Sequence, residues 1–99
     1  MATELPIIQC TLDTAGAREQ AARYAEVAGH VESITRAPRT LIAAVDANID
    51  AELMNELVTT ERACCTFFEI TWDGNLLTYA VSSADHAPAL DVIAEALSA

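Results

Sequence analysis

The residues able to do chemistry gather in one short stretch near the middle of the chain. On a helical wheel for residues 49–65, at about 100° per residue, Glu61 falls inside the apolar arc, so its carboxylate faces the core. Cys64 and Cys65 follow Glu61 at i+3 and i+4, the spacings at which helix side chains touch. Arg62 points to the polar side and does not neutralise Glu61. The sequence therefore predicts a cluster of one carboxylate and two thiols at a helix end.

This cluster favours metal binding over catalysis. Adjacent cysteines do not match the C-x-x-C spacing of zinc ribbons or thioredoxin-type sites, and the negative end of a helix raises a thiol pKa, which disfavours a nucleophile. A raised thiol pKa does not prevent the binding of a soft cation, because the bound cation itself deprotonates the thiols. We expect one thiophilic ion, Hg(II), Cu(I) or Zn(II), on Cys64 and Cys65, with Glu61 as acceptor or ligand. Cys10 becomes a third ligand if it reaches them.

Two other interpretations stay open at this point. In the first, Cys10, Cys64 and Cys65 are buried residues that only pack in the core, and Glu61 accepts backbone hydrogen bonds. The chain is then a non-catalytic protein-interaction or assembly module. In the second, one cysteine has a depressed pKa and attacks a small electrophile. No activated base, nucleophile elbow or phosphate-binding loop is identifiable, so we expect no enzyme activity and no nucleotide or organic cofactor.

The elements that position the cluster are predicted from hydrophobic periodicity and turn residues. Residues 7–12 alternate as a strand with Cys10 facing inward. The expected elements that follow are a helix over 14–28, strands over 31–35 and 40–45, a helix from Asp46 or Asp50 to Ala63 or Cys64, strands over 67–72 and 75–82, and a last helix after Ser83 or Asp85. This order, β-α-β-β-α-β-β-α, predicts an α+β two-layer sandwich: a mostly antiparallel sheet of about five strands with three helices on one face.

Three details of this arrangement can be tested directly. Asp73 and Gly74 predict a two-residue hairpin loop, which places Ile70 opposite Leu77 and Phe68 opposite Tyr79. The helix over 14–28 is expected to turn a mostly small side inward, namely Ala17, Ala21, Tyr24, Ala25 and Ala28. The uncovered sheet face should carry Phe67, Leu76 and Ala80, and a half-apolar exposed face of this kind predicts a homodimer.

Composition limits the remaining function classes. Ninety-nine residues predict a single domain over 1–99. The net charge of −10, with five arginines and no lysine, disfavours nucleic acid and membrane surfaces as partners. No charge-free apolar run approaches the roughly 18 residues of a membrane span. The first residues lack a basic segment followed by an apolar one, so we expect a cytoplasmic protein with reduced cysteines.

The run from Glu61 to Ile70, E-R-A-C-C-T-F-F-E-I, together with the opening Cys10-Thr11-Leu12, carries a resemblance. It resembles small, mostly uncharacterised actinobacterial proteins with a C-T-L-like opening and an E-R-x-C-C-P-F-F-like segment. Similar segments occur in proteins associated with mercury or arsenic resistance. The resemblance implies a role as accessory, buffer or sensor in metal resistance and points to Cys10, Glu61, Cys64 and Cys65. Thr66 stands where that pattern has proline. Because threonine does not block a helix as proline does, the position at which the helix ends is less strictly determined by the sequence.

Overall fold

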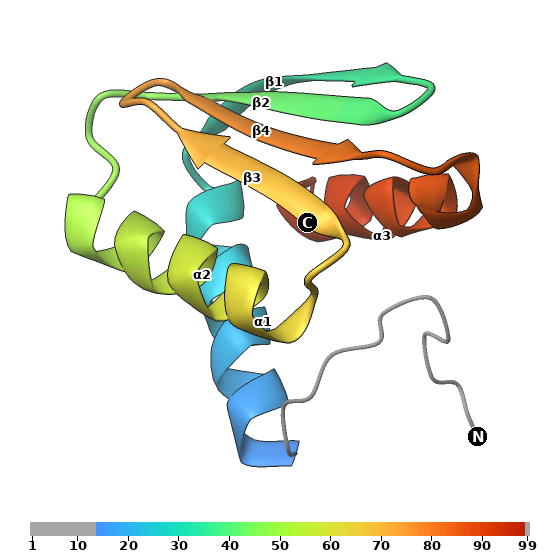
Figure 1. Cartoon of the computed structure of the whole chain (residues 1–99). Coiled ribbons are helices and arrows are strands. Elements are labelled where there is room, and N and C mark those ends of the chain that lie inside the picture. Colours follow the sequence, from blue (N-terminus) through green and yellow to red (C-terminus); the bar gives the residue numbers. More distant parts are fainter. Residues whose placement is uncertain (1–13, 99) are drawn as a thin grey trace.

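The computed structural model describes residues 14–98 of the chain. Its elements are α1 (Thr14–Ala28), β1 (Val31–Ala37), β2 (Thr40–Val45), α2 (Ala51–Cys64), β3 (Phe68–Trp72), β4 (Leu76–Val81), a 3-10 turn (Ala84–His86) and α3 (Ala87–Leu97). Within this part of the chain the strands form one antiparallel sheet in the order β1-β2-β4-β3, and the helices cover one of its faces (Figure 1). The α+β class is confirmed. The strand expected over 7–12 lies outside the described residues, so the sheet described here has four strands rather than five.

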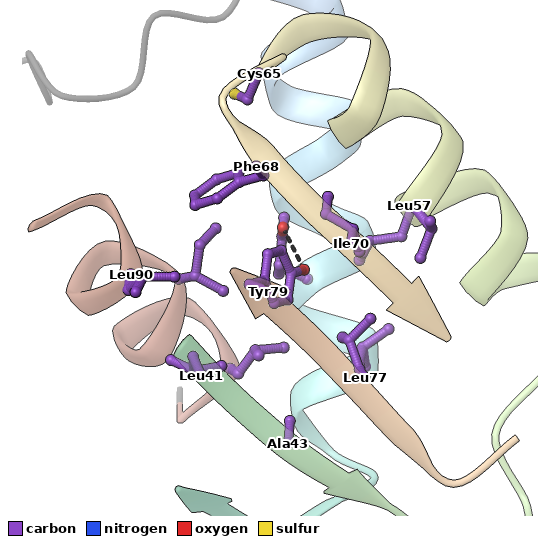
Figure 2. Close-up of a cluster of buried hydrophobic side chains, with 14 of the residues drawn as sticks. Leu41, Ala43, Leu57, Cys65, Phe68, Ile70, Leu77, Tyr79 and Leu90 are labelled. Atoms are coloured by element: carbon purple, nitrogen blue, oxygen red, sulfur yellow. Dashed lines mark hydrogen bonds between the residues drawn. The ribbon is translucent and has the colours of Figure 1, made fainter. Parts of the chain in front are cut away.

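The core forms where alternate residues of the strands meet the helices. In β2, Leu41, Ala43 and Val45 are buried, and their neighbours in the strand are half-exposed. The two layers meet at Tyr79 of β4, which Figure 2 shows in the middle of the buried cluster, together with apolar side chains from α2 and α3. None of the helices over residues 14–98 is both long enough and apolar enough to cross a membrane.

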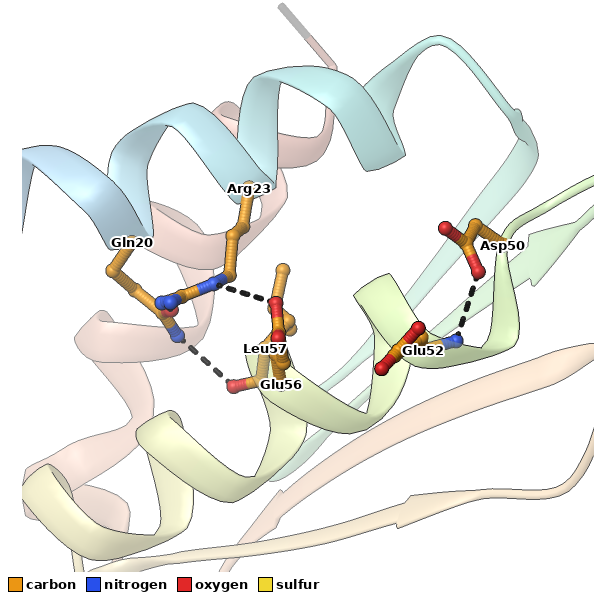
Figure 3. Close-up of polar contacts among 6 residues, drawn as sticks. All are labelled: Gln20, Arg23, Asp50, Glu52, Glu56 and Leu57. Carbon is orange, nitrogen blue, oxygen red and sulfur yellow. Dashed lines mark hydrogen bonds and ion pairs between the residues drawn. The ribbon is translucent and has the colours of Figure 1, made fainter.

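Helix α2 carries the predicted cluster, and its two ends are well defined. At its start the Asp50 carboxylate accepts a hydrogen bond from the Glu52 N–H at 3.0 Å (Figure 3), which satisfies one of the backbone donors left unpaired at a helix start. At its end Cys65 leaves helical geometry, with φ −123° and ψ 79°, although its N–H still donates to the Glu61 carbonyl oxygen at 2.8 Å. The stripe turned to the core consists of Met54, Leu57, Val58, Glu61 and Cys64.

Helix α1 presents a different side to the core from the predicted one. Its buried residues are Gln20, Tyr24 and Val27, whereas Ala17 and Ala21 are exposed. Only Tyr24 of the predicted inward side is buried. The physical reason is that alanine removes little apolar area from water, so the helix gains more by turning its few large side chains inward.

The β3–β4 hairpin pairs in a different register from the predicted one. Ile70 lies opposite Tyr79, and Phe68 lies opposite Val81, a shift of two residues from the expected partners Leu77 and Tyr79. Because side chains alternate with a period of two, this shift leaves every residue on its predicted face. Ile70, Phe68, Leu77 and Tyr79 are therefore all buried, as expected.

The hairpin turn explains the shift. The Asp73 N–H donates to the Leu76 carbonyl oxygen at 3.2 Å, and the Leu76 N–H donates to the Asp73 carboxylate at 3.3 Å. The two-residue loop is thus Gly74 and Asn75, one residue later than predicted. Of the residues described, only Gly74 has a positive φ, 91°, as the first loop position of a type II′ turn requires.

The sheet face away from the helices carries small and β-branched side chains. Leu76 is 43 % exposed there, and Ala80 lies on the same face, as predicted. Phe67 does not belong to it: the residue precedes β3, is half-buried and stacks on His86 with a centroid distance of 4.5 Å. We call this the outer sheet face; its half-buried members include Thr40, Ile42, Ala44, Thr78 and Ala80.

Candidate metal centre

The C-terminal end of α2 brings Glu61, Cys64 and Cys65 together, as the spacing predicts. One carboxylate oxygen and the two sulfur atoms all lie within 4.8 Å of one another, and the two sulfur atoms are 3.5 Å apart. All three residues are buried, with 3 %, 4 % and 0 % of their surface exposed. Cys10, the fourth predicted member, lies outside the described residues.

The local backbone holds the cluster against the sheet. The Phe68 N–H donates to the Cys65 carbonyl oxygen at 3.2 Å, which closes the turn between α2 and β3. The Arg62 guanidinium donates to the Ile70 carbonyl oxygen at 2.6 Å and so also ties the helix end to β3. Arg62 is engaged there and, as predicted, forms no ion pair with Glu61 within the described part of the chain.

A buried polar network around Glu61 was not predicted. One Glu61 carboxylate oxygen accepts hydrogen bonds from the Gln20 amide at 3.0 Å and from the Tyr24 hydroxyl at 2.9 Å. The Tyr79 hydroxyl lies 2.7 Å from that of Tyr24, the contact dashed in Figure 2. Since the single Tyr24 proton points to Glu61, Tyr79 donates to Tyr24. The network thus joins α2 to α1 and β4.

Arg23 of α1 contacts this network through Gln20. Its guanidinium donates to the Gln20 side-chain oxygen at 2.7 Å and pairs with Glu56 at 3.7 Å. The Gln20 amide also donates to the Leu57 carbonyl oxygen at 3.0 Å (Figure 3). Among the described residues, the groups that touch the Glu61 carboxylate are therefore neutral. Gln20 and Tyr24 are four residues apart on one helix face, which is the only signal of this network that the sequence contains.

The surroundings raise the pKa of the groups in and beside the cluster. Burial, followed by the negative charge of Glu61, raises the pKa of the Cys64 thiol from 9.0 to about 11. The Cys64 pKa is therefore raised, as predicted. The cause differs from the predicted one: burial and the Glu61 carboxylate raise the pKa, rather than the negative end of the helix. Burial is also the main reason that the pKa values of Tyr24 and Tyr79 lie well above 10.0. At neutral pH, Cys64 therefore carries its proton and is not an activated nucleophile.

The two cysteines differ in their oxidation state. Cys65 takes part in a disulfide bond, whereas Cys64 titrates as a thiol, so the expectation that the cysteines are reduced is wrong for Cys65 in this structure. The disulfide does not join the two neighbours, because their sulfur atoms are 3.5 Å apart and a disulfide bond is about 2.05 Å long. In this state the cluster therefore combines one thiol, one disulfide sulfur and one carboxylate.

No protein-family model, no curated protein and no solved structure matches the chain. The resemblance to actinobacterial proteins, and the metal-resistance setting that it implies, therefore stay predictions. What bears on function is the chemistry of the cluster itself.

Proposed function

We propose that the protein binds one thiophilic metal ion through Cys64 and Cys65 when both are reduced, with Glu61 as a third ligand or as an acceptor beside the ion. The observation that carries the proposal is the convergence of these three donor atoms within 4.8 Å. Two sulfur atoms bound to one ion at about 2.3 Å lie within about 4 Å of each other, and the observed separation of 3.5 Å fits that limit.

Charge balance supports a cation at this place. Glu61 is 3 % exposed, and a carboxylate removed from water is costly unless hydrogen bonds or a positive charge compensate it. Gln20 and Tyr24 supply two hydrogen bonds to the carboxylate but no charge. A metal ion would supply the charge and would also deprotonate the Cys64 thiol, which otherwise keeps its proton at neutral pH.

The donor set also limits the kind of ion. Sulfur ligands select soft or borderline ions, so Hg(II), Cu(I) and Zn(II) fit, while Mg(II) and Ca(II) prefer oxygen donors. If Cys10 joins as a third thiolate, this preference for soft ions becomes stronger. We place the protein in the cytoplasm as a non-catalytic accessory, buffer or sensor of metal resistance; the metal-binding form there is the one in which the Cys65 disulfide is reduced.

A metal titration tests this proposal. The fully reduced protein should take up about one Hg(II) or Cu(I) per chain, with a thiolate-to-metal charge-transfer absorption in the ultraviolet. Cys64→Ser should abolish that uptake because it removes one of the two sulfur ligands. Ser33→Ala, at an exposed position of β1, is the matched control and should bind like the native protein. Unchanged uptake by the Cys64→Ser variant would contradict the assignment.

The interaction-module interpretation keeps one observation in its favour, the outer sheet face with its exposed Leu76. In that case the cysteines would only pack in the core, and the predicted homodimer would form through this face. A coloured disulfide reagent separates the two functions: the native reduced protein shows two or three reactive thiols if the site is open to a metal, and essentially none if all are packed. Sedimentation of the Leu76→Asp variant beside the native protein tests the dimer.

A further inference from the structure

We propose that Glu61 is a direct ligand of this metal site, held in the ligating position by Gln20 and Tyr24, and that the ion is a borderline divalent cation such as Zn(II). This inference rests on the proposed function and names the class of ion that the site takes. Its basis is the way in which the Glu61 carboxylate is hydrogen-bonded on the side away from the two sulfur atoms' own helix, by donors of α1.

Both hydrogen bonds that the Glu61 side chain accepts within residues 14–98 fall on one oxygen atom. The Gln20 amide donates to Oε1 at 3.0 Å, and the Tyr24 hydroxyl donates to the same atom at 2.9 Å. An ionised carboxylate has about four acceptor positions, shared between its two oxygens. The two donors therefore fix the direction of the carboxylate through Oε1 and leave the lone pairs of Oε2 to a cation.

The two donors are themselves held in place. The second amide proton of Gln20 goes to the Leu57 carbonyl oxygen at 3.0 Å (Figure 3), and the Gln20 side-chain oxygen accepts from Arg23 at 2.7 Å. Gln20 is 5 % exposed and Tyr24 is 6 % exposed, so water competes weakly for either donor. Groups that bond to a metal-binding side chain in this way set its orientation, and losing one typically lowers metal affinity about 10- to 100-fold.

The charges of the cluster indicate the class of ion. Two thiolates and one carboxylate carry three negative charges, and the groups that touch the carboxylate are neutral. A divalent ion cancels two of these charges and Cu(I) cancels only one, and uncompensated charge is costly in a buried site. Zn(II) accepts thiolate and carboxylate ligands together. Hg(II) is also divalent, but it is a softer ion and gains little from a carboxylate oxygen.

Comparing Zn(II) with Cu(I) tests whether Glu61 is a ligand. In the reduced protein, Glu61→Gln should weaken Zn(II) binding by at least about tenfold and Cu(I) binding by less than about threefold, because two thiolates suffice for Cu(I). Competition with a coloured chelator for each ion measures both affinities. Infrared difference spectra with and without Zn(II) should show a shifted carboxylate stretch that Glu61→Gln removes. Glu52→Gln, an exposed position of the same helix, is the matched control and should bind both ions like the native protein.

A second pair of variants tests the positioning role. Tyr24→Phe should weaken Zn(II) binding by about tenfold and Cu(I) binding by less than about threefold, because the carboxylate loses a donor that orients it. Tyr79→Phe removes the same group from a residue that does not contact Glu61, so its effect on Zn(II) binding should be less than about threefold. Gln20→Met removes the other donor and repeats the test independently of Tyr24. Far-ultraviolet circular dichroism checks that each variant is folded.

The outcomes separate this inference from the proposed function. Equal weakening of Zn(II) and Cu(I) binding by Glu61→Gln, or no weakening of either, would overturn the ligand role and leave a thiolate site standing. Equal effects of Tyr24→Phe and Tyr79→Phe on Zn(II) binding would overturn the positioning role. A reduced native protein that binds neither ion would overturn the proposed function as well.

Discussion

Tyr24 is the residue on which the buried network depends, because its hydroxyl has two partners. It donates to Glu61 at 2.9 Å and accepts from Tyr79, whose oxygen is 2.7 Å away. The Tyr79 hydroxyl has only the contact to Tyr24 in the described part of the chain. Both tyrosines are buried, so water does not readily replace a lost partner.

Removing the two hydroxyls one at a time should therefore have unequal effects. Tyr24→Phe should lower the free energy of unfolding by about 2–3 kcal/mol, because a buried carboxylate loses a donor and Tyr79 loses its acceptor. Tyr79→Phe removes the same chemical group from the other end of the network and should cost about 1 kcal/mol. Urea unfolding of the two variants measures both values. Equal losses of unfolding free energy would contradict the hydrogen-bond order in which Tyr79 donates to Tyr24 and Tyr24 donates to Glu61.

The cluster was predictable and the network was not, for a physical reason. Glu61, Cys64 and Cys65 lie within five residues of one another, so the helical repeat alone brings them together. Gln20 and Tyr24 reach Glu61 from 41 and 37 residues away along the chain. Such contacts depend on how α1 is rotated against α2, which no local pattern in the sequence specifies.

At the scale of elements, α2 is the part of the fold that positions the candidate site. Its start is fixed by Asp50, whose side chain accepts from the Glu52 N–H at 3.0 Å. Its end is fixed by the tie between Arg62 and Ile70. The helix is thus secured at both ends, and its middle is held by the buried stripe.

The cap of α2 gives a second prediction. Asp50→Ala should lower the free energy of unfolding by about 1 kcal/mol, because an N-terminal backbone donor loses its acceptor. Glu95→Ala, at an exposed position near the end of α3, removes a carboxylate that caps no helix start and should change stability by less than about 0.5 kcal/mol. Thermal or urea unfolding gives both numbers. If the two variants lose the same stability, the cap has no special role.

The elements show where sequence patterns succeed and where they stop. The period of two placed Ile70 and Tyr79 on the buried face correctly even though the predicted partners were two residues away. The register was missed because the Asp73 side chain, rather than a main-chain oxygen, accepts the Leu76 N–H and moves the loop along the chain. For α1, a count of alanines could not reveal that three larger residues would turn inward.

For the whole molecule, the absence of lysine makes its alkaline titration simple to interpret. Between about pH 9 and pH 12, the side chains that lose protons are thiols and tyrosines, because arginine stays charged. The two tyrosines of the chain are both buried, and burial raises their pKa values well above 10.0. The Cys64 pKa is raised to about 11 in the same way. The folded state thus keeps protons that the unfolded chain releases.

Stability should therefore fall as the pH rises. A group whose folded pKa is raised contributes its full stability below its unfolded pKa and loses it as the pH climbs toward the folded value. The decline should begin near the ordinary Cys64 value of 9.0 and steepen above 10.0, where unfolded tyrosines ionise. Urea unfolding at about pH 8 and at about pH 10.5 measures it. Tyr79→Phe should flatten the slope, and a stability independent of pH would contradict the buried positions of these groups.

The chain of hydroxyls that ends on Tyr79 also gives the molecule an internal optical signal. An ion that settles between the two sulfur atoms changes the field at Glu61, and Glu61 is in direct contact with one of only two phenol chromophores in the chain. The near-ultraviolet circular dichroism of these rings then reports occupancy of the site, with no dye or label attached.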